Sequence, residues 1–159
     1  ASYILETYRG IVIVVNKWDL RREIGLDKQT MEARIRGKFK FASYAPIVFT
    51  SALNSDGINE LLDTALRVQV EWSKGIPRPD IRRTVLSAVA ENPPPSGGRR
   101  VLKLYSAMQD TTMPPSFTFF VNHTDMIHFS YRRYLENKLR EEYTFEGAPI
   151  RFRFRGWKR

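Results

Sequence analysis

A run of five β-branched apolar residues, Ile11 to Val15, constrains the fold more than any other stretch of the sequence. Such a run is typical of a strand buried on both faces in a parallel sheet. The run stops at a polar tetrad, Asn16-Lys17-Trp18-Asp19. Because open α/β sheets bind ligands at the carboxyl ends of their strands, the tetrad is a candidate binding site. A simple polar turn after a strand would have the same composition, so the tetrad alone does not decide the function.

The tetrad has the form Asn-Lys-x-Asp and resembles the guanine-specificity motif of Ras-like GTPases. Guanine presents two neighbouring N–H donors, and one carboxylate can accept both in a strong, geometrically selective arrangement. The resemblance implies that Asp19 binds this edge of the base. It also implies that Asn16 bonds the base and braces the nearby loops, while the stem of Lys17 lies along the base face.

A second motif follows the next expected strand, residues 46–50, which leads directly into Ser51-Ala52-Leu53. Ras-like GTPases carry a Ser-Ala loop after their last strand. The similarity implies that the backbone N–H of Ala52 meets the guanine carbonyl oxygen and that Ser51 holds its loop against Asp19. Alone, Ser-Ala is a weak motif, but here it stands at a strand end, a little over thirty residues after the first motif.

Helices are expected around these two motifs. Asp27 is a suitable N-cap for a helix that ends near Lys40, and residues 58–73 have the broad apolar face of a packed helix. Residues 1–75 are therefore similar to the last third of a Ras-like P-loop GTPase domain, an α/β fold.

The phosphate-binding part of such a domain is missing from the sequence. A P-loop has the pattern Gly-x4-Gly-Lys-Ser/Thr, and neither this pattern nor Asp-x-x-Gly occurs in the 159 residues. Phosphoryl transfer depends on positioned phosphates, metal and water. We therefore expect no catalytic residues here, no GTP hydrolysis by this chain alone, and Mg²⁺ only in the complete protein. Because residues 2–8 read as the tail of a helix, we also expect a fragment of a longer chain.

The second half of the chain follows a Pro- and Gly-rich break that marks a linker over residues 76–80. Periodicity after it predicts five elements: a helix over 81–91, strands over 99–108 and 116–122, a helix from an N-cap at Asp125 to about Tyr143, and a strand over 150–157. The order helix–strand–strand–helix–strand is that of a small α+β layer. Residues 81–159 resemble a KH-like domain.

Four segments carry a more specific resemblance, to the carboxyl-terminal domain of the bacterial Der (EngA) GTPases. They are Asn92 to Pro95, Phe120 to Asn122, His128 to Asn137 and Phe145 to Arg151. Members of this family have two tandem G domains and a terminal KH-like domain, and act in assembly of the large ribosomal subunit. The resemblance implies GTP or GDP as ligand, and as partners ribosomal RNA or the large subunit and the missing G domains. The Gly-x-x-Gly loop with which KH domains clamp RNA does not occur here.

The net charge of +9 is concentrated in the second half, where residues 76–159 carry 15 Lys/Arg against 8 Asp/Glu. This excess suggests an anionic partner such as RNA, although basic character can also serve solubility alone. Five arginines are candidates for contact with RNA phosphates or with another domain, the alternative being a solvated surface. They are Arg151, Arg153 and Arg155 on one face of the last strand, and Arg132 and Arg133 on the preceding helix.

Composition excludes several other classes. No cysteine is present, and the two histidines, His123 and His128, have no ligand-spaced partners, so we expect neither disulfides nor a metal site. No apolar run approaches the ~20 residues of a membrane helix, and the start of the chain lacks the pattern of a signal peptide. We expect a cytoplasmic protein without a membrane partner. A non-catalytic module that docks on RNA or ribosomes remains the alternative to a GTP-binding protein.

Overall fold

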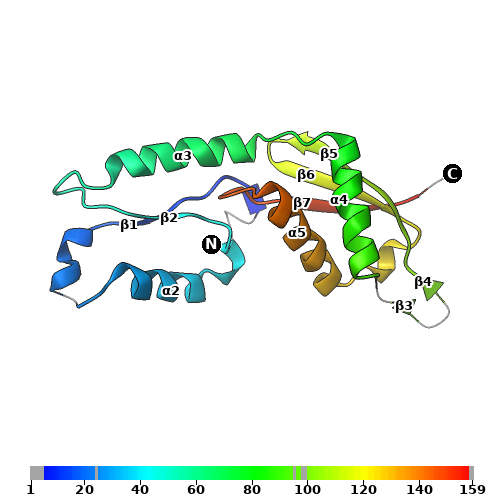
Figure 1. Cartoon of the computed structure of the whole chain (residues 1–159), viewed down its shortest axis with the longest axis horizontal. Coiled ribbons are helices and arrows are strands. Elements are labelled where there is room, and N and C mark those ends of the chain that lie inside the picture. The colour runs from blue at the N-terminus through cyan, green and yellow to red at the C-terminus, as the bar shows by residue number, and fades with distance from the viewer. Residues whose placement is uncertain (1–5, 24, 95, 98–99, 158–159) are drawn as a thin grey trace. The chain divides into compact units, whose positions relative to one another are not determined.

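The computed structural model describes residues 6–23, 25–94, 96–97 and 100–157 (Figure 1). The chain divides into two compact units. Unit 1 comprises Ala1–Trp72 together with Glu146–Pro149, and unit 2 comprises Ser73–Phe145 together with Ile150–Arg159. Of the helix expected over residues 2–8, only residues 6–8 lie within the described part of the chain.

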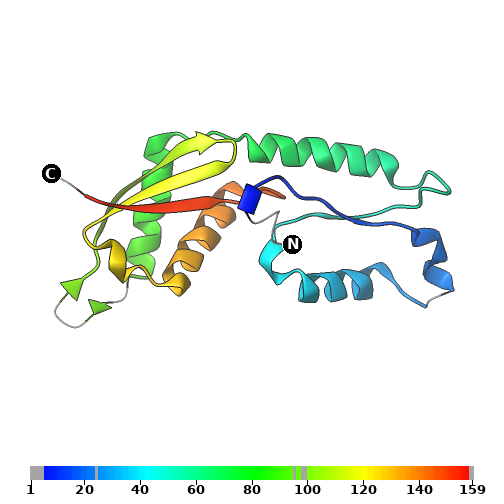
Figure 2. The same ribbon diagram turned by 180° about the vertical axis from the view of Figure 1, so that it is seen from behind.

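Unit 1 is built on two short parallel strands with Val14 opposite Val48. A parallel pair needs a crossover connection, and the intervening helix α2 provides it. Helices α2 and α3 run on opposite sides of the strand pair (Figure 2). The elements are β1 (Ile13–Val15), the 3₁₀ helix η1 (Trp18–Arg22), α2 (Lys28–Lys38), η2 (Lys40–Ala42), β2 (Ile47–Phe49) and α3 (Ile58–Trp72).

The start of α2 is fixed by Asp27, which confirms the predicted N-cap. Its Oδ1 accepts a hydrogen bond from the backbone N–H of Thr30 at 2.8 Å, and its Oδ2 accepts one from the Thr30 hydroxyl at 2.8 Å. These bonds stabilise the carboxylate and lower the pKa of Asp27 below its ordinary value. A donor that would be left without a partner at the helix start is thereby satisfied.

The expectation that the first strand is buried on both faces was wrong. The Val14 side chain is 43% exposed, and Ile13 and Val15 are only partly buried. Within the described residues β1 pairs with β2 alone. A strand with a single neighbour has one open edge and incomplete cover, so an apolar run is not sufficient for burial.

A segment distant in sequence, Glu146–Pro149, completes unit 1. The backbone N–H of Gly147 donates to the Tyr44 carbonyl at 2.8 Å, and the Gly147 carbonyl accepts from the Ile11 N–H at 2.8 Å. Gly147 has φ +67°, and a Cβ there would lie 2.4 Å from Cγ2 of Val68. Glycine is therefore the residue that this position accepts. The contacts tie together the segments that lead into β1 and β2.

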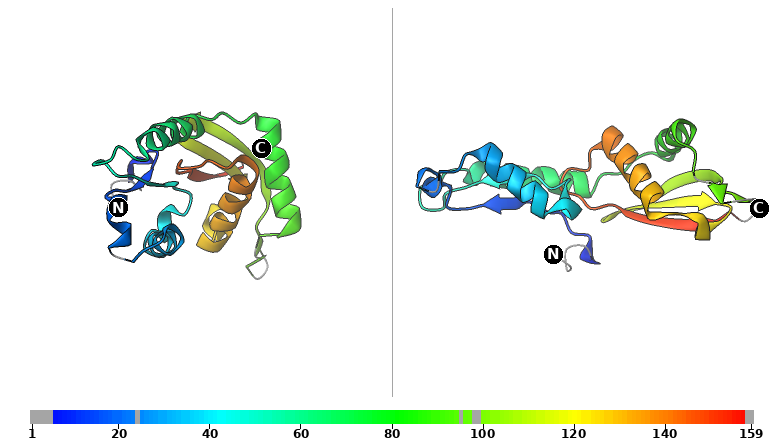
Figure 3. Two further views of the ribbon diagram at one scale, coloured as in Figure 1. Left: turned by 60° about the vertical axis from the view of Figure 1, so that its left-hand side comes forward. Right: turned by 90° about the horizontal axis from the view of Figure 1, so that it is seen from below.

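Unit 2 is a three-stranded sheet in the order β5-β6-β7, in which β5 and β6 are antiparallel and β6 and β7 are parallel. Two helices cover one face of this sheet (Figure 3). The predicted order helix–strand–strand–helix–strand is confirmed, with a small additional hairpin after the first helix. The elements are α4 (Arg78–Glu91), β3 (Ser96–Gly97), β4 (Arg100–Val101), β5 (Leu104–Thr112), β6 (Pro115–Val121), η3 (Thr124–Met126), α5 (Phe129–Tyr143) and β7 (Arg151–Gly156).

The core of unit 2 follows the two sequence periods. Phe117, Phe119 and Val121 alternate along β6 and are fully buried. Leu135 and Leu139 of α5 lie one helical turn apart and are also buried. Phe119 packs against Phe152 and Phe154 of β7, with ring centroids 4.7 and 5.1 Å apart. Each fully buried side chain of this size contributes about 1.5–3 kcal/mol relative to exposure.

Three predicted boundaries were wrong. Asp125 does not cap the long helix, because it lies in η3, which carries Met126 into the core; α5 begins at Phe129 with His128 as its N-cap. The expected strand 99–108 is two elements, β4 and β5, with residue 99 outside the described part. β5 continues to Thr112 through a register shift after Gln109, because the ladder to β6 persists up to Pro115. None of the described helices has the length and apolar character that crossing a membrane requires.

Candidate functional site

The carboxyl ends of β1 and β2 lie side by side and bring together the two polar loops expected to bind guanine. The Thr50 N–H donates to the Val15 carbonyl, and the Trp18 N–H donates to the Thr50 carbonyl, both at 2.9 Å. These bonds extend the strand ladder into the loops. Asn16 and Ala52 are therefore neighbours although 36 positions separate them.

Asn16 connects the loops through a single side-chain oxygen. Its Oδ1 accepts from the backbone N–H of Ala52 at 3.2 Å and from the Thr50 hydroxyl at 3.3 Å. The same oxygen accepts from the backbone N–H of Lys17 at 2.8 Å. Lys17 itself is exposed and adopts a left-handed conformation with φ 61°. The chain turns there from β1 into η1, which places Asp19 beside the second loop.

Asp19 is held by Ser51. The Ser51 hydroxyl donates to Oδ1 of Asp19 at 2.5 Å and accepts from the backbone N–H of Asn54 at 3.3 Å. Ser51 is buried, whereas Asp19 is partly exposed. A carboxylate has several lone pairs, so a hydroxyl on Oδ1 leaves Asp19 with capacity to accept two further donors.

Two residues that the sequence reasoning did not single out shape this loop. Thr50 contributes its hydroxyl and both backbone bonds. Gly57, with φ +72°, closes the loop into α3, and a Cβ there would lie 2.3 Å from the Phe49 carbonyl oxygen. Ser51 and Asp56 pair across the loop, with N–H to carbonyl distances of 3.0 and 3.1 Å. The Asp-Gly dipeptide was the signal available for this turn.

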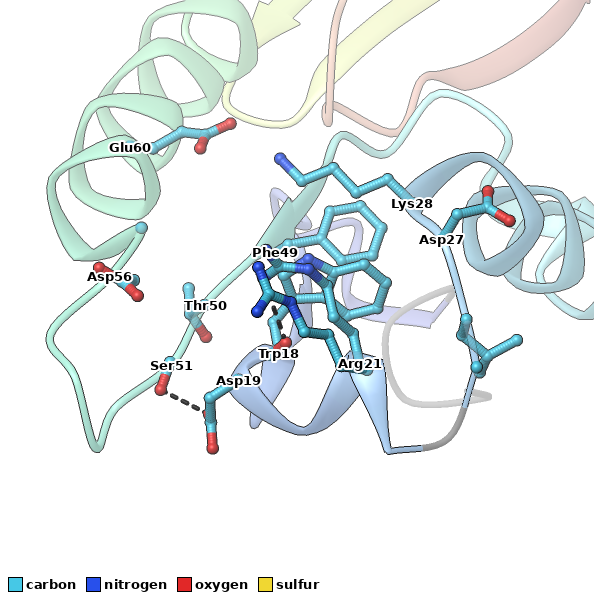
Figure 4. Close-up of a pocket in the computed structure, with 14 residues that line it drawn as sticks. Trp18, Asp19, Arg21, Asp27, Lys28, Phe49, Thr50, Ser51, Asp56 and Glu60 are labelled. Atoms are coloured by element: carbon cyan, nitrogen blue, oxygen red, sulfur yellow. Dashed lines mark hydrogen bonds between the residues drawn. The ribbon is translucent and has the colours of Figure 1, made fainter.

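A cavity of about 750 Å³ opens beside the loops (Figure 4). Trp18 and Phe49 pack at its centre with ring centroids 4.4 Å apart. Cations flank these rings, because Arg21 lies 6.0 Å from the Trp18 ring and Lys28 lies 5.4 Å from the Phe49 ring. The cavity shares Asp19 and Ser51 with the expected guanine site. Its lining does not include Asn16, Lys17 or Ala52.

The candidate arginines of unit 2 occupy two separate surfaces. Arg151, Arg153 and Arg155 alternate with the buried Phe152 along β7, so they lie on the sheet face away from the helices. Arg153 is 3.8 Å from Asp110, whose carboxylate also accepts a hydrogen bond from the Thr118 hydroxyl. Arg132 and Arg133 lie on α5, which covers the opposite face. The structure does not bring the two sets together.

Among the residues that the structure describes, no group of three or more His, Asp or Glu side chains is placed to hold a metal ion. No chemical step in this chain is assigned to a magnesium ion.

The mixed sheet, its two covering helices and their order define unit 2 as a KH-like domain. A family model described as "KH-domain-like of EngA bacterial GTPase enzymes, C-terminal" matches residues 76–155. The chain belongs to this family, and the resemblance predicted from the sequence is confirmed.

Relatives match along nearly the whole chain. GTPase Der of Chloroflexus aggregans is 42% identical over 163 residues, which cover 100% of this chain and 36% of that protein. GTPase Der of Streptococcus uberis is 41% identical over 150 residues, covering 94% of this chain and 34% of the relative. GTPase Der of Enterococcus faecalis is 42% identical over 151 residues, covering 95% and 35%. The chain spans about a third of the length of these relatives.

Proposed function

We propose that the complete protein is a GTP-binding GTPase of the Der (EngA) type, in which residues 1–75 form the last third of a Ras-like G domain. This chain supplies the guanine-reading loops and the KH-like domain. The names of the relatives support the activity. The observation that carries the proposal is the hydrogen-bonded junction of the two loops, in which Ser51 contacts Asp19 at 2.5 Å and Ala52 contacts Asn16 at 3.2 Å.

The chemistry of this junction suits guanine. Asp19 accepts the ring N–H and the exocyclic amine of the base, a donor pair that adenine lacks. The Lys17 stem covers the base face. The Ala52 N–H already donates to Asn16, so a guanine carbonyl at this position would share that donor with Asn16 and remain bound to the same loop.

The test replaces Asp19 in the complete protein and measures which nucleotide base the protein prefers. Loss of a charged hydrogen-bond partner costs about 1.5–3 kcal/mol, so Asp19→Asn should lower GTP affinity by that amount. The same change should raise the affinity for XTP, whose 2-oxo group accepts from an amide. Isothermal titration with GDP, GTP and XTP measures both effects. Asp63→Asn, on the exposed side of α3, is the matched control, and unchanged GTP affinity in the Asp19 variant would contradict the assignment.

Hydrolysis belongs to the complete protein. The 159 residues contain no P-loop pattern, and phosphoryl transfer requires positioned phosphates and Mg²⁺. We expect a magnesium-dependent phosphate-release assay to give turnover for the complete protein and only the blank rate for this chain. Turnover by this chain would refute the assignment. A complete protein without turnover would favour the alternative, a non-catalytic docking module.

We propose ribosomal RNA or the large ribosomal subunit as the partner of the KH-like domain, in the cytoplasm. The excess of basic residues in the second half of the sequence supports an anionic partner. RNA binding by this chain should then weaken steeply as the salt concentration rises. Binding that is insensitive to salt would argue against phosphate contacts.

A further inference from the structure

A second cavity, of about 560 Å³, lies within unit 2 and combines aromatic with basic side chains. We call it the aromatic–arginine pocket. Helix α4, strand β5 and the residue that follows β7 each contribute to it, so no continuous stretch of sequence reveals it. Its lining residues are Arg78, Pro79, Arg82, Tyr105, Ser106 and Trp157.

The two rings of the pocket are large and accessible. Tyr105 and Trp157 lie with ring centroids 5.8 Å apart and planes inclined by 40°. Tyr105 is 41% exposed and Trp157 is 45% exposed. A further aromatic ring stacked on rings of this kind adds about 0.5–1.5 kcal/mol beyond the area that it buries.

Trp157 is held in place although it is exposed. Its backbone N–H donates to the Val121 carbonyl at 2.8 Å, which extends the ladder beyond β7. Phe120 of β6 meets the indole edge to face, with centroids 5.7 Å apart and planes at 83°. The ring is thus oriented from below by the sheet, and little ordering of the protein is needed when a ligand covers it.

The charge of the pocket is of one sign. Arg78 and Arg82 stand one turn apart in α4, and both are exposed. The lining contains no carboxylate. The nearby Asp80 pairs instead with Arg83, at 2.9 Å. Neither Arg78 nor Arg82 takes part in the ion pairs found within the described residues, so both guanidinium groups can meet an anion.

A flat ring system with an attached anion satisfies both halves of the pocket. We propose that the aromatic–arginine pocket binds a nucleotide of single-stranded RNA, with the base stacked against Trp157 and Tyr105 and the phosphate at Arg78 and Arg82. Stacking on aromatic side chains combined with a basic groove is the general mode of single-strand binding.

The surface continues along the open face of the sheet. Arg155 precedes Trp157 by two residues in an extended segment, so the two side chains point to the same face. Arg155 is also paired in register with Phe120. A neighbouring phosphate of the same RNA strand can therefore reach Arg155. Arg153 is a weaker candidate because Asp110 partly neutralises it.

This inference rests on the proposed RNA partner and names the site that receives it. The test measures fluorescence anisotropy of a labelled single-stranded oligouridylate against the full 159-residue chain. Trp157→Ala should weaken binding about 5- to 150-fold, the fold-change that corresponds to ~1–3 kcal/mol for one stacked base. Trp157→Phe, which keeps a stacking ring, should retain most of the affinity. Phe129→Ala is the matched control, because Phe129 is 77% exposed on α5 and lies outside the pocket.

The arginines are tested through salt. Arg78→Ala and Arg82→Ala should each reduce the slope of log affinity against log salt by about 1. Arg34→Ala, on the exposed side of α2 in unit 1, should leave the slope unchanged. Thermal unfolding of every variant accompanies the titrations, and the expected result is no shift for the exposed arginine positions.

The outcomes distinguish a failure of the pocket proposal from a failure of the proposed RNA partner. If the chain binds the oligonucleotide but Trp157→Ala binds it as tightly as the unchanged chain, the pocket is overturned and the RNA partner stands. The same result is expected if the pocket serves a protein neighbour. If the unchanged chain does not bind RNA at low salt, the RNA partner itself is contradicted, and the pocket proposal falls with it.

Discussion

The two-stranded sheet of unit 1 and the three-stranded sheet of unit 2 use apolar strands in different ways. In unit 2, Phe117 and Phe119 of β6 are fully buried beneath two helices. In unit 1, Val14 of β1 is 43% exposed, although its stretch of sequence is the more uniformly apolar. Alternation, and not the length of an apolar run, therefore marked the strand with the better-packed face.

The difference in packing between the two sheets matches the part of the molecule that each sheet positions. The three-stranded sheet of unit 2 supports a surface, because its open face carries arginines and ends at Trp157. The two-stranded sheet of unit 1 supports loops, because its strands are three residues each and their ends hold the Asn16 and Ser51 hydrogen bonds. Side-chain burial should dominate the stability of unit 2, whereas backbone contacts should dominate that of unit 1.

The largest expected effect concerns burial in unit 2. Phe119→Ala removes a fully buried ring and should cost about 3–5 kcal/mol of unfolding free energy. Urea unfolding measures the loss of free energy. Hydrogen exchange shows where it occurs, and the amides of β5 to β7 should lose protection. Phe129→Ala, at an exposed position, should stay within about 0.5 kcal/mol. If Phe119→Ala reduced the exchange protection of β1 and β2 equally, the two units would not differ in what stabilises them.

A backbone position in unit 1 comes next. Gly147→Ala places a Cβ against Val68 and the Ile11 carbonyl at a positive φ, and should cost about 1–3 kcal/mol. Loss of exchange protection at the Ile11 amide, which donates to Gly147, is the specific sign. Gly37→Ala is the control, because a Cβ at residue 37 would meet nothing within 4 Å and alanine suits a helix. If both variants were equally stable, steric fit at residue 147 would not matter.

The smallest effect is a hydrogen bond with a pH signature. The Tyr131 hydroxyl donates to the Asn92 carbonyl at 3.0 Å, so Tyr131→Phe should cost about 0.5–1.5 kcal/mol at neutral pH. Burial, helped by the nearby Tyr134, raises the pKa of Tyr131 to about 12 from an ordinary 10.0. Between these values the unfolded chain binds fewer protons than the folded one, so stability falls as pH rises.

Tyr131→Phe should lack this part of the fall in stability at alkaline pH. Urea midpoints of both proteins measured from pH 9 to pH 12 test it. The two curves should converge as pH rises through the window from about 10 to about 12. Parallel curves would show that Tyr131 keeps an ordinary pKa.

Much of the fold was predictable because its signals are local. The Asp27 cap, the i+4 line of α5 and the alternation of β7 each depend on neighbours within a few residues. The failures involve contacts between distant segments. Asp125 has the composition of a cap but lies in η3, where Met126 anchors the chain to the core. The exposure of Val14 depends on how many strands pair with β1, which periodicity does not report.

The candidate sites divide in the same way. Asn16, Asp19, Ser51 and Ala52 were identifiable because each loop follows its strand in a short motif. Gly57 was missed because its necessity arises from the Phe49 carbonyl across the loop. The aromatic–arginine pocket was missed because it needs three separate elements. Trp157 gave no sign beyond its place at the end of a strand.

The participation of Glu146–Pro149 in unit 1 affects any attempt to take the protein apart. A single cut near residue 75 would remove Gly147 and the fully buried Ala148 from unit 1. It would also remove the hydrogen bonds that Gly147 makes with the Ile11 N–H and the Tyr44 carbonyl. The two units are therefore not interchangeable modules, and recombination or truncation at the linker should yield a first half that is prone to aggregate. The truncated protein to make is one in which a designed connection joins residues 146–149 to the first half of the chain.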